Sequence, residues 1–391
     1  MLELDREIKF DSARAEEFFE SLASRPAVVR IEPHEALAGA RPVLLRTADL
    51  RRRMRLLLGE RNVNSKRLNL REYAAAIHFR ITGSRFEQAL VHWQQARSLW
   101  PANYRQRLRL YAPAFVKVNL ANPYPRAYIT RRLGAPGIYL GPFITRRAAE
   151  SFLEPCLDLF RIRRCQIKIR RDPAFPGCIY SEMKMCLAPC FGGCTPEEYA
   201  DEVSRVTVFL RTGGTSLADA LAQERESASA RLDFEQASAL HRRLEKVQEL
   251  RRALPEVVRP IELLHAVIVM RAAAENTIAL FVVRVGRIAG PFLLQFTDLA
   301  SQPRSAEQIL RELLEPTTPQ PSDRDSEDAN TGVSDTQSLE DHLALLARWF
   351  YASPREGEII FQEPRPVGWP YRRILRACKR LLTSDGADKT D

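Results

Sequence analysis

The sequence predicts an α+β protein with several domains, and three observations carry this prediction. Short apolar runs bounded by Gly, Pro and Asn recur over 27–143 and 263–296, which is typical of strands. Five of the seven cysteines fall within 165–194. Residues 196–252 contain few helix breakers, which predicts a long helical region. A chain of 391 residues can hold two or three domains, each with its own core.

The chain divides into seven predicted segments. In order, they are a polar, helical lead-in (1–25), a small α/β domain (26–105), a basic connector with the Cys-rich stretch (106–195), a helical hairpin (196–255), a β-rich region (256–315), a disordered linker rich in Pro, Ser and Asp (316–338), and a C-terminal α/β piece with a tail (339–391).

Within the first domain, AVVRIEP and PVLLRTA predict two strands joined by a loop. A helix is expected to begin after Asp49, a good N-cap residue, and AAAIHFRIT predicts a third strand. The run RFEQALVHWQQARSLW predicts a long helix that ends before Pro101.

The later segments alternate in the same way. The runs FVKVNL, AYITRR and GIYLGPF predict strands that lead into a helix near 146–160. LLHAVIVM, TIALFVVRV and FLLQF predict three more strands. A last helix–strand–helix unit is expected from SLEDHLALLARWFYA, GEIIF and YRRILRACKRLL.

The charge of the chain is unevenly distributed. The net charge is +10, yet residues 41–171 alone hold 28 Lys or Arg against 7 Asp or Glu, a local charge of +21 that leaves −11 elsewhere. This polarity favours a basic region that faces a polyanion such as DNA, although a solvated basic surface is the alternative. The N-terminus lacks an apolar signal region and no apolar run is long enough to span a bilayer, so we expect a cytoplasmic protein with no membrane partner.

Four cysteines, Cys165, Cys178, Cys186 and Cys190, have the spacing C-x12-C-x7-C-x3-C. In a cytoplasmic protein disulfides do not persist, which leaves a metal centre, a redox site or a coincidence. Structural zinc sites usually contain C-x2-C pairs, which this spacing lacks. Four thiolates on longer loops suit a 4Fe–4S cluster, with zinc and free thiols as alternatives. Cys194 could compete as a ligand.

The segment ARLDFEQASALHRRLEKVQEL gives the clearest helical pattern in the chain. Its apolar stripe consists of Ala237, Leu240, Leu244 and Val247. Asp233 with Gln236 resembles a capping box that restarts the helix after the preceding amphipathic stretch. Because a lone two-helix hairpin buries little surface, the stripe is expected to pack either on a partner or on the chain itself.

These motifs, in this order, resemble the UvrC family of excinucleases. The cysteine text CIYSEMKMCLAPC is similar to that family's iron–sulfur site, and ANPYPRAYITRR followed by GIYLGPF also resembles the family. The likeness implies a 4Fe–4S cluster and a nucleotide excision repair protein that binds DNA. LDFEQASALHRRL resembles the family's UvrB-binding motif. For UvrB contact, the resemblance implies Phe234, Ala237, Leu240, Leu244 and Val247.

The first domain resembles a GIY-YIG endonuclease that has lost most of its catalytic residues. That family uses two tyrosines, an arginine and a glutamate that holds Mg²⁺ or Mn²⁺. Here Val29 and Val43 align with the tyrosines, and His92 aligns with the glutamate. Arg53 matches the catalytic arginine, and Arg46 replaces a nearby lysine. Arg53 is equally consistent with a phosphate contact, and a lone His92 is more often a helix-face residue than a ligand.

The expected DNA contacts are basic side chains in the arginine-rich half. They are Arg51, Arg52, Arg55, Arg131, Arg132, Arg163 and Arg164. The family's second nuclease resembles ribonuclease H, and the sequence ends before such a domain would begin, so 5′ incision is expected to be absent. The preferred hypothesis is a DNA- and UvrB-binding protein with an impaired nuclease. The alternatives are a 3′-incising nuclease with substituted residues and an iron–sulfur nucleic-acid-binding regulator unrelated to repair.

Overall fold

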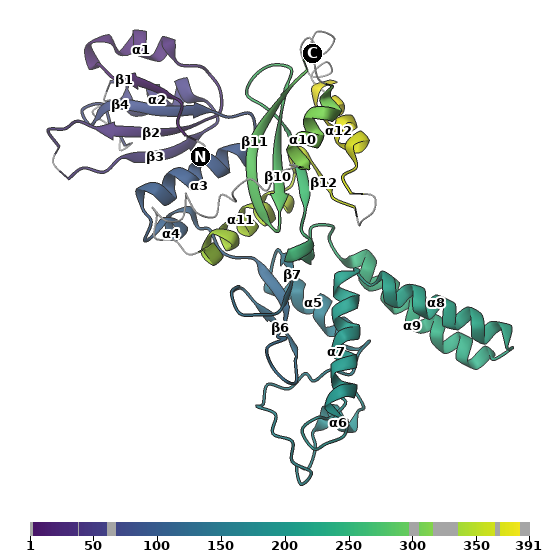
Figure 1. Cartoon of the computed structure of the whole chain (residues 1–391). Helices are drawn as coiled ribbons and strands as arrows, with labels where there is room; N and C mark the ends of the chain where they lie inside the picture. The colour runs from purple at the N-terminus through teal and green to yellow at the C-terminus, as the bar shows by residue number, and fades with distance from the viewer. Residues whose placement is uncertain are drawn as a thin grey trace.

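The computed structural model describes residues 3–37, 39–60, 68–296, 305–315, 335–363 and 368–383. Three four-stranded sheets with surrounding helices form the N-terminal, middle and C-terminal parts of the described chain, and Figure 1 shows them in purple to blue, blue to teal, and green to yellow. The α+β class predicted from the sequence is confirmed. Within the described residues, no helix is both long and apolar enough to cross a membrane.

The N-terminal part is an antiparallel sheet with strand order β1-β4-β2-β3. Its elements are β1 (Arg6–Lys9), α1 (Ala15–Ser21), β2 (Ala27–Pro33), β3 (Val43–Thr47), α2 (Leu50–Leu58), β4 (Ala74–Ile81), α3 (Arg85–Leu99) and α4 (Tyr104–Leu108). The lead-in contains a strand as well as the expected helix, because β1 satisfies the backbone groups along the outer edge of β4. Asp49 caps α2 as predicted, since its Oδ1 accepts the Arg52 N–H at 2.8 Å.

Alternation along β2 sends its side chains to two different cores. Val29 and Ile31 pack with α1 and α2, whereas Val28 packs in the core that contains α3. Helices α2 and α3 therefore cover opposite faces of this sheet.

The middle part has the strand order β6-β5-β7-β8. Its elements are β5 (Ala114–Val118), β6 (Ala127–Thr130), β7 (Ile138–Phe143), α5 (Arg146–Leu157), α6 (Ile179–Glu182), α7 (Pro196–Arg211) and β8 (Arg259–Pro260). Residues 161–194 extend from the sheet to the far end of α7, which runs back toward the body (Figure 1). Tyr199 on α7 joins the two because its hydroxyl donates to Pro125 O at 2.7 Å and accepts the Arg163 N–H at 3.0 Å.

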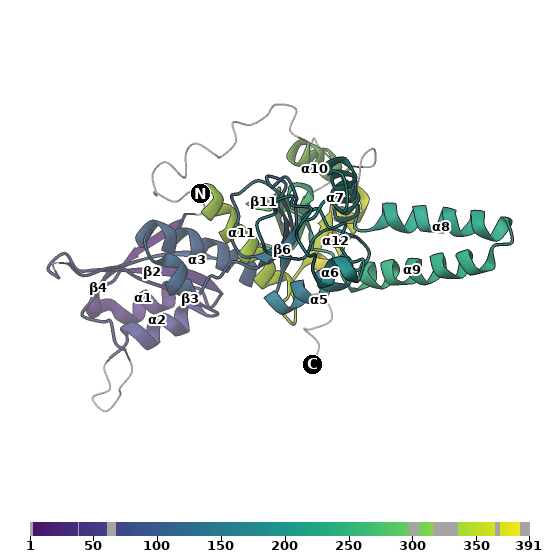
Figure 2. The ribbon, with the colours of Figure 1, turned by 90° about the horizontal axis from the view of Figure 1, so that it is seen from below.

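Helices α8 (Thr215–Ala230) and α9 (Phe234–Ala253) form an antiparallel hairpin that projects from the body (Figure 2). The chain turns from α7 into α8 at Gly214, whose φ of 81° lies in the left-handed region. Only half of the expected capping box forms at the start of α9. The Gln236 N–H donates to Asp233 Oδ1 at 3.1 Å, but Gln236 Oε1 accepts from Arg231 instead of returning to the cap.

The C-terminal part has the strand order β11-β10-β9-β12. Its elements are β9 (Ala266–Arg271), β10 (Thr277–Arg284), β11 (Arg287–Gln295), α10 (Ala306–Leu314), α11 (Asp335–Phe350), β12 (Glu358–Phe361) and α12 (Tyr371–Thr383). Strand β12 pairs with β9, so the segments before and after the predicted linker share one sheet. Helix α11 begins inside the predicted linker, and the rest of that linker, 316–334, lies outside the described residues.

Helix α3 belongs to two parts of the molecule at once. One side packs on β2 and β3, and the other packs on the C-terminal sheet and α11. The Phe86 ring lies 5.1 Å from the Phe281 ring of β10 and 5.3 Å from the Trp349 ring of α11. The N-terminal sheet is thus joined to the rest of the chain by a shared apolar core.

A buried carboxylate fixes α11 to the N-terminal part. Asp341 is 1% exposed, and its oxygens accept from Trp93 Nε1 at 3.0 Å, the Tyr104 hydroxyl at 2.5 Å and Arg105 Nε at 2.6 Å. Burial, partly offset by these donors, raises the pKa of Asp341. The same environment raises the pKa of Tyr104 to about 12, first through burial and then through Asp341. The three hydrogen-bond donors compensate the carboxylate of Asp341 for the loss of water that its burial requires.

Candidate metal-cluster site and nucleic-acid interface

The four cysteines with the predicted spacing line one cavity of about 180 Å³ at the far end of α7. Cys165 lies at the end of the connector, Cys178 precedes α6, and Cys186 and Cys190 follow it. Arg163, Ile169 and Phe175 also line the cavity, so it is closed by both apolar and basic side chains. The structure therefore gathers residues that are up to 25 positions apart in the sequence.

Each of the four sulfurs has a polar donor nearby. Cys186 Sγ accepts the Ala188 N–H at 3.3 Å, and Cys190 receives a backbone hydrogen bond from Phe191. Longer contacts of 3.9 Å join the Ser181 hydroxyl to Cys178 Sγ and the Arg163 guanidinium to Cys165 Sγ. Such donors stabilise negative charge on sulfur, which thiolate ligands of a metal centre carry.

The thiols also influence one another. Burial raises the pKa of Cys186 to about 11, and the nearby Cys165, Cys190 and Cys178 contribute to this rise. Burial likewise raises the pKa of Cys190. Four thiolates here would repel each other unless a cationic centre lay between them, so the donor set fits a group that supplies positive charge.

The four thiols are spread around the wall of the cavity. Across the described ranges, no three Cys, His, Asp or Glu side chains gather closely enough to hold a single metal ion. A tetrahedral zinc needs all four sulfurs at about 2.3 Å from one point. Four thiolates are also the ligand set of a 4Fe–4S cluster, in which each sulfur binds a different iron.

The remaining cysteines lie elsewhere. Cys194 is buried but does not line the cavity, so its expected competition as a ligand finds no support in this geometry. Cys156 on α5 and Cys378 on α12 are 2% and 0% exposed. Burial raises the pKa of each to about 12, which keeps them as neutral thiols.

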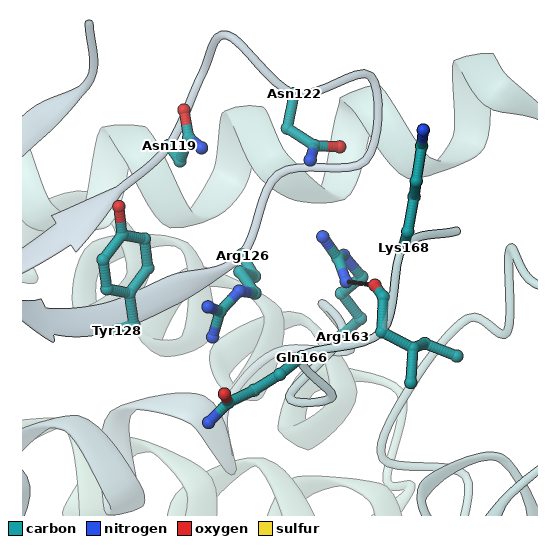
Figure 3. Close-up of a pocket in the computed structure, with 8 residues that line it drawn as sticks. Asn119, Asn122, Arg126, Tyr128, Arg163, Gln166 and Lys168 are labelled. Atoms are coloured by element: carbon teal, nitrogen blue, oxygen red, sulfur yellow. Dashed lines mark hydrogen bonds between the residues drawn. The ribbon is translucent and has the colours of Figure 1, made fainter. Parts of the chain in front are cut away.

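A second, polar pocket of about 420 Å³ adjoins the cysteine cavity. The loop between β5 and β6 supplies one wall and the segment 163–168 supplies the other, as Figure 3 shows. Its polar lining consists of Asn119, Asn122, Arg126, Tyr128, Arg163, Gln166 and Lys168. Arg163 and Ile167 line both the pocket and the cysteine cavity, so the two hollows share a wall.

Residues 114–209, which contain both hollows, match the sequence model of the family described as UvrC/Cho excinuclease, middle domain. This segment is similar to the UvrC family. The chain is 29% identical over 178 residues to UvrABC system protein C of Ruminiclostridium cellulolyticum, a match that covers 45% of this chain and 29% of that protein.

Two further relatives carry the same name. The protein of Hahella chejuensis is 28% identical over 291 residues, 71% of this chain and 45% of its own length. That of Moorella thermoacetica is 34% identical over 137 residues, 35% of this chain and 22% of its own length. The chain thus spans less than half the length of these curated UvrC relatives. No solved structure matches it.

The arginines predicted to contact DNA divide into two groups. Those engaged within the chain include Arg51, which donates to the carbonyls of Leu22 and Glu20, and Arg55, which pairs with Glu16. Arg163 donates to three carbonyls and Arg164 pairs with Asp158. The exposed members are Arg52, Arg131 and Arg132, together with Arg53.

The residues aligned with a nuclease centre are divided between the two faces of the N-terminal sheet: Val29 and Val43 lie on the α1 and α2 side, whereas Arg46 lies near His92. Val29 is fully buried under α1 and α2, and Arg53 is exposed on α2. His92 lies on α3, which covers the opposite face of the sheet. The nearest carboxylate in α3, Glu87, is 4% exposed; its Oε2 accepts the Gly83 N–H at 2.9 Å and its Oε1 faces Arg80 at 3.5 Å.

A guanidinium group lies near His92. Burial and then the nearby Arg46 lower the pKa of His92 to about 4. Burial and then Arg348 of α11 lower the pKa of Arg46. A neutral imidazole beside guanidinium groups is a poor site for a divalent cation, which needs oxygen ligands with negative charge.

The apolar stripe of the hairpin is mostly internal. Leu244 and Val247 are 5% and 0% exposed in the core beneath the hairpin, and Leu240 is half-buried against it. At the tip, by contrast, Phe234 is 67% exposed and Leu232 is 72% exposed. The most exposed apolar surface of the hairpin is therefore the tip, which includes Phe234 of the predicted contact set, and Ala237 in the next turn is half-buried.

Proposed function

We propose that this chain is a nucleotide excision repair protein of the UvrC type that binds DNA and UvrB and carries a 4Fe–4S cluster, without working as a nuclease. Cys165, Cys178, Cys186 and Cys190 would hold the cluster. When bound, it would supply the positive charge that neutralises the four thiolates and would join loops that have little secondary structure of their own.

One contrast carries the proposal. The segment that matches the UvrC middle domain keeps four cysteines around one cavity, with donors to the sulfurs. The N-terminal centre, in contrast, has a buried valine, a neutral histidine and two arginines where the nuclease chemistry needs tyrosines, a carboxylate and a metal. Binding functions are supported by the first observation, and loss of catalysis is supported by the second.

Incision of a lesion-containing duplex tests the nuclease part of the proposal. With UvrA, UvrB, ATP and either Mg²⁺ or Mn²⁺, the chain is expected to shift the UvrB–DNA complex in a gel and to leave both strands uncut. The reason is that a neutral histidine takes the place of the carboxylate that would hold a metal to activate water.

Arg53→Ala runs alongside as the diagnostic variant. Its side chain is exposed on α2, so the change should not disturb folding. Cutting 3′ of the lesion that disappears in this variant would show a nuclease with substituted residues and would end the non-catalytic interpretation. An intact duplex with no shifted complex would remove the repair role.

The exposed tip of the hairpin is expected to bind UvrB. Phe234→Asp places a charge in the apolar tip and should weaken UvrB binding by about tenfold or more, because a buried aromatic anchor contributes roughly 2 kcal/mol or more at an interface. Binding is measured by titration calorimetry with purified UvrB.

Leu56→Asp is the matched control, since Leu56 is an exposed leucine on α2, outside the hairpin. Equal affinity of the two variants would place the UvrB contact elsewhere. If the chain is an iron–sulfur regulator unrelated to repair, the wild-type protein and both variants should bind nucleic acid but show no affinity for UvrB.

A further inference from the structure

The polar pocket beside the cysteine cavity holds donors that the proposed cluster does not use. Its walls come from the turn after β5, which contains Asn119 and Asn122, and from the segment that leads to the cysteines, which contains Lys168. Among the residues that the structure describes, no Asp or Glu lines it. A hollow of this composition is unsuited to a cation and favours an anion.

The two asparagines are oriented by the backbone. Asn119 Oδ1 accepts the Ala121 N–H at 3.3 Å, and Asn122 Oδ1 accepts the Tyr124 N–H at 2.9 Å. With both oxygens engaged in turns of this kind, the two amide NH₂ groups remain as donors. In the part of the chain that the structure describes, neither NH₂ group donates to another protein atom.

The cations of the pocket are similarly available. The Arg126 guanidinium lies over the Tyr128 ring, 4.6 Å from its centroid, a contact that holds its plane without using its hydrogen-bond donors. Lys168 has no ion-pair partner among the described residues. Arg163 differs, because its donors already serve backbone carbonyls that include that of Tyr124. It therefore shapes the wall that the pocket shares with the cysteine cavity.

The volume and the boundaries of the pocket limit the kind of anion that it can bind. A hollow of about 420 Å³ is in the range of small-molecule sites and is larger than a lone phosphate requires. It is bounded by one loop and one neighbouring segment, so it can take one nucleotide but cannot follow the regular backbone of a duplex.

We propose that this pocket binds one nucleotide of a single-stranded DNA segment, which Arg126, Lys168 and the amide groups of Asn119 and Asn122 contact from different sides. The inference rests on the proposed DNA-binding function and adds to it a defined subsite. It places unpaired DNA against the wall of the cysteine cavity, so that the ligand and the cluster contact opposite sides of Arg163 and Ile167.

Asn122→Asp is the sharpest test. Aspartate keeps the oxygen that accepts the Tyr124 N–H, so the turn should persist, but it replaces the NH₂ donor by negative charge. Fluorescence anisotropy of the full chain, purified anaerobically, is measured with a labelled single-stranded oligonucleotide, with a blunt duplex and with dAMP as competitor. We expect about a tenfold or greater loss of affinity for the single strand and little change for the duplex.

A charge-matched pair completes the design. Arg126→Gln with Lys168→Gln should reduce the salt dependence of single-strand binding by about 0.7 in the logarithmic slope for each phosphate that is no longer neutralised. Arg242→Gln with Lys246→Gln removes the same two charge types from α9 and should leave single-strand affinity within about twofold of wild type.

The outcomes separate the subsite from the function on which it rests. Wild-type protein that binds no DNA of any form would remove the proposed function itself. If Asn122→Asp binds the single strand as tightly as wild type does, the proposed nucleotide site is wrong but the DNA-binding function stands. The same conclusion follows if the α9 control loses as much affinity as the pocket double variant. Capture of dAMP without capture of the oligonucleotide would overturn the assignment to a strand.

Discussion

Replacing one of the four cavity cysteines is expected to remove the metal and to disorder residues 165–194. Cys186→Ser should lower iron and sulfide to background after anaerobic purification, because a cluster needs all of its thiolate ligands and folding of such loops is coupled to metal binding. The sulfur removed is the one that accepts the Ala188 N–H and whose pKa burial raises to about 11. Loss of the cluster should expose residues 165–194 to limited proteolysis.

Cys194→Ser is the matched control. Cys194 lies four residues after Cys190 and is also buried, yet it does not line the cavity. This variant should keep its iron and its protease resistance. Zinc in place of iron in the wild-type protein would refute the cluster, and unchanged iron in Cys186→Ser would refute the ligand set.

Removing the buried carboxylate of α11 should have the largest effect on stability. Asp341→Ala leaves the Trp93 Nε1, the Tyr104 hydroxyl and Arg105 without their common acceptor. Losing one partner of a buried ionic network costs roughly 3–5 kcal/mol, since the groups left behind are desolvated and unpaired. Because a chain of several domains need not unfold in one step, the measurement is hydrogen exchange of amides in α3 and α11.

A second aspartate on the same helix provides the control. Asp335 pairs with Arg287 at the surface, where such pairs contribute roughly 0–1 kcal/mol, so Asp335→Ala should leave exchange nearly unchanged. Asp341→Asn keeps one acceptor oxygen, so its amide exchange rates should lie between those of Asp341→Ala and Asp335→Ala. Equal exchange in Asp341→Ala and Asp335→Ala would show that apolar packing alone fixes α11.

Local signals predicted most of the elements well. The alternation in AVVRIEP and the apolar run TIALFVVRV correspond to β2 and β10, and Asp49 marks the residue before α2. These predictions succeed because periodicity and capping depend on neighbours within about four residues. Strand β1 was missed because its identity as a strand depends on the free edge of β4, which follows it by more than 60 residues.

The functional sites were predicted unevenly for the same reason. Cysteine spacing is a short-range signal, and the four thiols do share one cavity. The asparagine pocket joins a hairpin turn to a segment about 40 residues later, and no motif records that meeting. Asp341 resembles a solvated helix residue until its position is compared with Ala344 and Leu345, which lie on the same buried side. A carboxylate on an apolar helix face was the one signal that could have revealed the network.

The shared position of α3 bears on how such a protein can change over evolution. A nuclease domain attached only by a flexible tether can be deleted whole. Here deletion of the first hundred residues would strip Phe86, Leu90 and Trp93 from the core that also holds the C-terminal sheet. Under the proposed loss of nuclease activity, a catalytic side chain would instead be exchanged singly for one that packs, in the way that Val29 packs beneath α1 and α2. The proposed function therefore implies that catalytic residues can be lost one at a time, while the N-terminal part is retained because its α3 holds the C-terminal sheet.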